Sequence, residues 1–116
     1  MSTPQSVRTD VGYVTELPGG VGVNSGADAA IPSNTTLYTA TDAATDVTVT
    51  LPDARISNGQ TLFVNADASG AAGGDIIITP AGTDTLTGGD ITVATTANQT
   101  YLLVASDTTW TPLQLA

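Results

Sequence analysis

The sequence predicts an all-β fold, a small antiparallel β-sandwich of jelly-roll type that follows an extended N-terminal arm. Three observations support this expectation. Short segments rich in Thr, Val and Ile recur between turn residues, and this composition suits half-buried strands. Residues that favour surface helices are scarce, since Lys is absent and Glu16 is the only Glu. The 116 residues suffice for one core, filled mainly by aliphatic side chains because only 4% of the residues are aromatic.

Strand-like segments follow one another from residue 36 onward. They span 36–40, 46–51, 60–65, 75–79, 84–86, 90–94, 100–105 and 110–115. Strict alternation places Val47, Val49 and Leu51 on one face of the second segment. Phe63, in the third segment, is expected to pack in the core. Turn residues separate these segments at short intervals, which is typical of sandwiches and barrels.

Residues 1–33 differ from the rest and are predicted to form the arm, with the sandwich domain over residues 34–116. The segment 17–23, Leu-Pro-Gly-Gly-Val-Gly-Val, cannot sustain a helix and is a poor central strand. A disordered tail without a role is the alternative. Against that alternative, residues 1–33 contain more apolar side chains than a solvating tail would. This favours an arm that becomes ordered along another subunit. The apolar residues include Val11, Tyr13, Val14, Leu17, Val21 and Val23.

The charge balance excludes several classes of partner. Two basic residues stand against 11 acidic ones, and the net charge is −9. Such a chain repels phosphate backbones and anionic lipid head groups, so neither nucleic acid nor a membrane is expected as a partner. No apolar run approaches the length of a membrane span.

The residue types needed for most catalysis are missing, and we expect a protein that is not an enzyme. His and Cys are absent, which removes the usual general bases, thiol nucleophiles and nitrogen or sulfur metal ligands. Asp42, Asp46 and Asp53 could in principle supply a carboxylate pair, but Asp at strand ends is a common turn residue. No cofactor and no metal are expected. The loop 67–75 offers two carboxylates that leave a calcium site open, although a plain surface loop is favoured.

The order of segments from residue 35 to 115 resembles a β module common in bacteriophage tail fibres, head fibres and capsid decoration proteins. The segments that carry the resemblance are 47–54 (Val-Thr-Val-Thr-Leu-Pro-Asp-Ala), 58–64 (Asn-Gly-Gln-Thr-Leu-Phe-Val), 76–86 and 103–110. The resemblance implies a small β-sandwich on the surface of a virion, assembled as a homotrimer. A small domain without disulfides also has a limited core, and burial between copies would add to its stability.

The resemblance further implies a capsid decoration (cement) protein that is assembled in the host cytoplasm and binds the outer surface of the major capsid protein. We expect the arm to lie along the capsid through Tyr13, Val14, Leu17, Val21 and Val23. Trp110, Leu113 and Leu115 are the candidates for a trimer seam. Thr111-Pro112 departs from the usual module and leaves Leu113 and Leu115 available to a neighbour, whereas Trp110 follows a polar hairpin and has core packing as its alternative. The alternative is a head-fibre or tail-fibre module that binds a host receptor or glycan.

Overall fold

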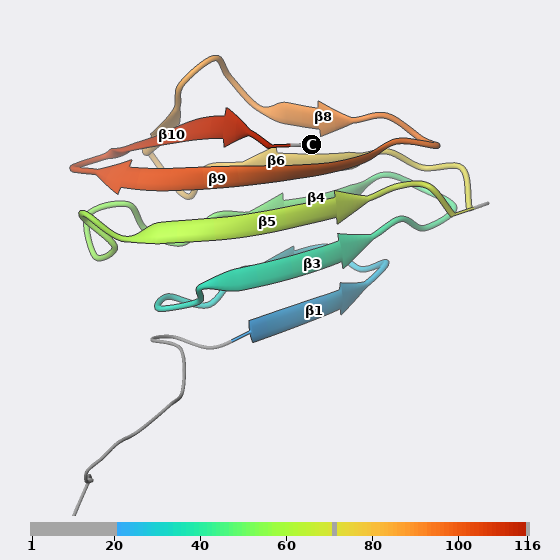
Figure 1. Ribbon diagram of the computed structural model, residues 1–116, viewed down its shortest axis with the longest axis horizontal. Helices are drawn as coiled ribbons and strands as arrows, with labels where there is room; N and C mark the ends of the chain where they lie inside the picture. The colour runs from blue at the N-terminus through green and yellow to red at the C-terminus, as the bar shows by residue number, and fades with distance from the viewer. Residues whose placement is uncertain (1–20, 71, 116) are drawn as a thin grey trace, which may run out of the picture.

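A computed structural model describes residues 21–70 and 72–115 (Figure 1). Within these ranges all the regular elements are β-strands, so the all-β prediction is confirmed there. No helix that could span a membrane is found among these residues. The strands are β1 (Val21–Ser25), β2 (Ala29–Ala30), β3 (Leu37–Thr41), β4 (Val47–Thr50), β5 (Thr61–Asp67), β6 (Ile76–Thr79), β7 (Thr85–Leu86), β8 (Ile91–Val93), β9 (Asn98–Ser106) and β10 (Thr109–Gln114). Each predicted strand segment overlaps one of the strands β3 to β10, with ends that differ by up to two residues.

The strands form two sheets that enclose one core. The first sheet has six strands in the order β1-β3-β5-β9-β10-β7, and the second has four in the order β2-β4-β6-β8. Figure 1 shows β1, β3, β5, β9 and β10 side by side in one layer, with β4 and β6 behind them. The described chain is therefore a two-layer β structure of the sandwich kind.

The pairing within the sheets differs from the antiparallel expectation. From β1 to β6 the chain alternates between the sheets, so that β1–β2, β3–β4 and β5–β6 form three stacked turns. Neighbours from successive turns are consequently parallel: β1 with β3, β3 with β5, β2 with β4 and β4 with β6. Antiparallel pairing begins where the chain reverses, with β8 on β6, β9 on β5 and β10 on β9. The short edge strand β7 again pairs in parallel, with β10.

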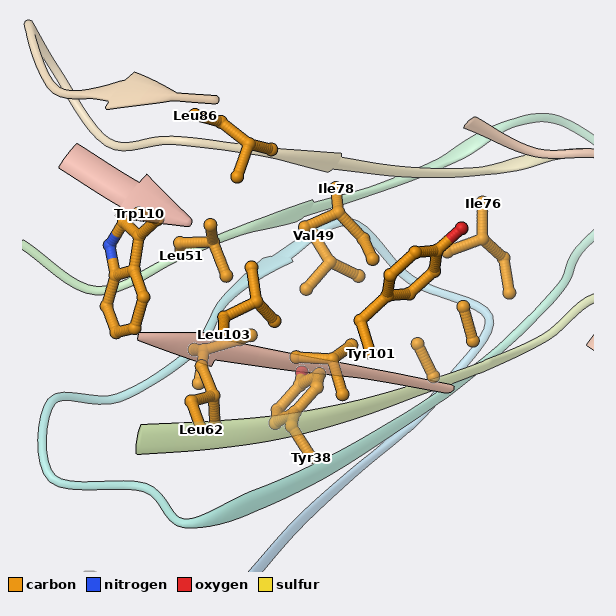
Figure 2. Close-up of a cluster of buried hydrophobic side chains, with 14 of the residues drawn as sticks. Tyr38, Val49, Leu51, Leu62, Ile76, Ile78, Leu86, Tyr101, Leu103 and Trp110 are labelled. Atoms are coloured by element: carbon orange, nitrogen blue, oxygen red, sulfur yellow. The ribbon is translucent and has the colours of Figure 1, made fainter. Parts of the chain in front are cut away.

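The core lies between the sheets and is built from inward-facing aliphatic and aromatic side chains (Figure 2). Val47, Val49 and Leu51 are all buried, as their alternation predicts. Alternate residues of the six-stranded sheet meet them from the other side. The large buried side chains of that sheet include Tyr38, Leu62, Val64, Tyr101, Leu103 and Trp110.

The predicted arm is partly sheet. Residues 21–33 contribute β1, β2 and the buried Ile31, whose amide donates to the carbonyl of Thr50 at 2.8 Å. Gly22 explains how so glycine-rich a segment fits a strand. A Cβ on Gly22 would lie 2.6 Å from Cδ1 of Tyr38, so only glycine lets the tyrosine ring pack against β1. Residues 1–20 of the predicted arm lie outside the described residues.

Pro112 lies within β10 without ending it. β10 pairs with β9 over its full length, and Pro112 is opposite Leu103. On its other side β10 is paired with β7 only at Thr109 and Trp110. The amide of Leu115 points toward β9 and donates to the carbonyl of Thr100 at 2.8 Å. Backbone amides alternate in direction along a strand, so the nitrogen of Pro112, three residues earlier, points away from β9 toward the free edge. Proline is tolerated there because no ladder donor is required.

Candidate interaction surface

Five apolar residues from five strands line up across the outer face of the six-stranded sheet. The pairing register places Val21 beside Leu37, Leu37 beside Phe63, Phe63 beside Leu102 and Leu102 beside Leu113. We call this set, Val21, Leu37, Phe63, Leu102 and Leu113, the apolar row. Its direction is perpendicular to the strands, and it crosses the sheet from β1 to β10.

The apolar row is accessible at several points. Leu113 is 59% exposed and Phe63 is 36% exposed, while Leu37 and Leu102 are partly covered. Threonine and asparagine occupy much of the outer face on both sides of the row. Asn65, for example, donates through Nδ2 to Asn98 Oδ1 and Thr100 Oγ1, both at 2.9 Å. Further exposed apolar residues lie beside the row at Val23, Val104 and Leu115.

The outer face of this sheet is almost free of charge, although the chain is strongly acidic. Every described acidic residue except Asp67 lies in a connection between strands. Asp67 is the last residue of β5. Hydrogen bonds from the Ser69 hydroxyl, and next from the Ser69 amide, hold the pKa of Asp67 below its ordinary value and keep it ionised. The acidic surface therefore borders the apolar row without crossing it.

The three residues predicted for the trimer seam do not lie on one surface. Trp110 is 1% exposed and lies among the core side chains (Figure 2). Its indole Nε1 donates to the carbonyl of Pro52 at 2.9 Å. Trp110 is therefore unavailable for a surface seam, because its side chain points from β10 toward the four-stranded sheet. Leu113 and Leu115 are both exposed, and Leu113 belongs to the apolar row.

Only two of the five predicted capsid-binding residues lie within the described part of the chain. Val21 and Val23 project from β1, and Val23 is 73% exposed. β1 is one of the two edge strands of the six-stranded sheet. Tyr13, Val14 and Leu17 fall within residues 1–20, outside the described residues.

Three members of the apolar row, Leu37, Phe63 and Leu102, were not among the site residues predicted from the sequence. The expectation that Phe63 packs in the core is wrong, because Leu62 and Val64 take the inward positions of β5 and the two-residue period turns Phe63 outward. A usable signal was present. Leu37-Tyr38, Leu62-Phe63 and Leu102-Leu103 are consecutive apolar residues in strands with only one face toward the core.

Several aspartates hold successive turns of the fold together. Asp28 Oδ1 accepts a hydrogen bond from the amide of Thr48 at 2.8 Å. Asp46 Oδ1 accepts one from the amide of Asp75 at 3.1 Å, and Asp75 Oδ1 accepts one from the amide of Thr95 at 2.9 Å. Each carboxylate precedes a strand of the four-stranded sheet; Asp28 and Asp46 take a backbone donor from the next turn, and Asp75 takes one from Thr95, which follows β8. These acidic residues have a structural use in the fold.

Two further carboxylates, Asp53 and Asp84, also accept hydrogen bonds from the backbone, whereas none is found for Asp42 Oδ2 within the described part of the chain. Asp53 Oδ1 accepts from the amide of Arg55 at 2.9 Å, as expected for a turn residue. Asp84 Oδ2 accepts from the amide of Ala54 at 2.8 Å. Asp42 Oδ2 is covered and has no hydrogen-bond partner among the described residues. Residues 21–70 and 72–115 contain no cluster of three or more His, Cys, Asp or Glu that could hold a metal.

Comparisons with known proteins add nothing to this geometry: no family model, no curated protein and no solved structure matches the chain.

Proposed function

We propose that this chain is a non-enzymatic structural protein of a bacteriophage virion, a homotrimeric decoration protein that binds the outer surface of the capsid. The observation that carries the proposal is the apolar row on a sheet face whose strands carry a single charged side chain, Asp67. A contiguous apolar strip with polar margins is typical of protein–protein contact surfaces. Residues that lie on hydrogen-bonded strands also present this strip without rearrangement. The resemblance of residues 35–115 to phage decoration and fibre modules supplies the setting.

The edge strand β1 is the part of the described chain that we assign to the capsid. It is the strand that residues 1–20 enter, and it carries the exposed Val21 and Val23. Three copies held together would offer three such edges to the shell, and linked weak contacts combine through their effective concentration. Binding to the assembled shell alone would stabilise that shell by mass action.

The substitution Val23→Asp tests this assignment. Purified chain is mixed with shells of the encoding phage that lack it, the shells are sedimented, and bound chain is quantified. We expect Val23→Asp to reduce binding by at least about tenfold, because a buried unpaired carboxylate costs more than 1.4 kcal/mol. The matched control is Thr92→Asp, which puts the same charge on β8 at the outer face of the four-stranded sheet, and it should bind like the unmodified chain. Equal binding by both variants would contradict a role for β1. No binding by the unmodified chain would contradict the proposed function.

A further inference from the structure

We infer that the apolar row is the trimer seam, with Leu37, Phe63, Leu102 and Leu113 of each copy packed along a three-fold axis. The inference rests on the proposed function, because that proposal supplies the trimer. It replaces the seam expected from the sequence, which included the buried Trp110. A second and a third copy of this chain are the occupants of the row.

Charge is the first reason to choose another copy as the occupant. Copies of a chain with a net charge of −9 repel one another wherever their carboxylates approach. The face that carries the apolar row has no charged side chain on its strands other than Asp67. It is therefore a face on which two copies can meet with few opposing like charges. A basic partner would instead favour the acidic connections.

The shape of the row is the reason for three copies. The row spans four strand spacings of about 4.8 Å, roughly 19 Å in all. Across β3 and β5 it is narrow, because Thr39 and Asn65 flank it on one side and Thr61 flanks Phe63 on the other, and on β9 Val104 widens it by one residue. Two sheets packed face to face bury a broad area, whereas three sheets around an axis meet along a line. A long, narrow apolar strip fits the second arrangement.

This placement also separates the two contact regions of the molecule. With the axis along the row, β1 lies at one end of the trimer and β10 toward the other. Val21, the terminal member of the row, then lies at the end where β1 meets the shell. Hydrogen-bonding residues such as Asn65 and Thr100 line the margins of the seam, where polar contacts between copies are expected.

The first test is the mass of the unmodified chain and of Phe63→Asp by native mass spectrometry and sedimentation velocity. The unmodified chain should be a trimer, and Phe63→Asp should be a monomer with an unchanged far-UV circular dichroism spectrum. The expected loss of affinity is at least roughly 100-fold, because like charges brought together at an interface cost several kcal/mol. Thr92→Asp is the control and should remain a trimer. If Phe63→Asp does not fold, Leu113→Asp replaces it, because Leu113 is more exposed than Phe63, and this variant should also be a monomer.

Cross-linking provides a second and independent test. The chain has no Cys, so Phe63→Cys introduces one thiol per copy. Facing sheets pack about 10 Å apart, and a bis-maleimide of that span should therefore join two copies at this position. Covalent dimers should form rapidly with Phe63→Cys and should be absent with Thr92→Cys.

The outcomes separate this inference from the proposed function. A trimer that persists in both Phe63→Asp and Leu113→Asp, without cross-linking at position 63, overturns the seam and leaves decoration intact. A dimer broken by Phe63→Asp overturns the three-fold arrangement. A monomeric unmodified chain overturns the inference together with the trimer, while shell binding is still measured separately through Val23→Asp.

Discussion

Replacing Trp110 with alanine is expected to lower the free energy of unfolding by about 3–5 kcal/mol. Trp110 is the largest of the fully buried side chains, and its substitution would leave a cavity between the sheets. The change also removes the indole donor of Pro52, whose carbonyl would lose its 2.9 Å hydrogen bond. Since small domains are stable by only about 5–15 kcal/mol, the variant should lose a large fraction of its stability.

Urea denaturation followed by far-UV circular dichroism measures this effect at one fixed protein concentration. Circular dichroism is required because Trp110 is the only Trp and its fluorescence disappears with it. Trp110→Phe keeps most of the volume but not the donor, and it should lie between alanine and the unmodified chain. Thr92→Ala, at an exposed position of β8, should change stability by less than about 0.5 kcal/mol. A Trp110→Ala variant as stable as Thr92→Ala would mean that the indole is not in the core.

Gly74→Ala is expected to be the second large destabilisation, about 3 kcal/mol or more. Gly74 lies where two successive turns of the fold touch, and its amide donates to the carbonyl of Ala43 at 2.8 Å. A Cβ added there would lie 2.3 Å from the carbonyl oxygen of Thr45 and 2.6 Å from that of Ala43. Both neighbours are backbone atoms, so the two turns must separate to admit the methyl group. The Asp46–Asp75 hydrogen bond beside them should be lost as well.

The matched control lies in the same loop. A Cβ on Gly70 would meet Asp42 Oδ1 at 2.9 Å, but that oxygen is the far end of a side chain that can move. Gly70→Ala should therefore cost less than about 1 kcal/mol, whereas Gly74→Ala should unfold at a much lower urea concentration. Similar midpoints for the two variants would show that the turns at Gly74 are not packed as described.

The strands could be predicted from the sequence because most of them alternate between apolar and polar residues. Val47, Val49 and Leu51 illustrate this, since the alternation gives both the strand and its buried face. β1 was not predicted because its signal was hidden by Gly22, which reads as a breaker until the ring of Tyr38 is seen to occupy the space of its Cβ. Local pattern cannot show such a tertiary contact.

The parallel pairing and the apolar row depend on information that no single segment contains. An alternating strand looks the same whether its neighbour is the next strand or the one after it, so the two-sheet winding of β1 to β6 was missed. The apolar row requires the register of five strands at once. Leu113 was proposed for a seam from its local departure from the module, while Phe63 was assigned to the core because aromatic residues usually lie there.

Gly74 shows how a loop residue can be misjudged from composition. In the sequence it belongs to a glycine-rich stretch after Asp67, which suggests a permissive surface loop. In the structure it is buried and has backbone on the side where a side chain would project. Glycine composition reports conformational freedom, but it does not report which glycine is needed for close approach.

The most direct test of the central claim is the copy number of this chain in purified virions of the encoding phage, relative to the major capsid protein. Quantitative mass spectrometry with labelled peptides from both proteins gives the ratio. Decoration predicts a copy number that is set by the shell symmetry, is a multiple of three and is of the same order as the copy number of the major capsid protein. A handful of copies per particle would contradict decoration and favour a fibre module that binds a receptor or glycan, and absence from the particle would contradict any virion role.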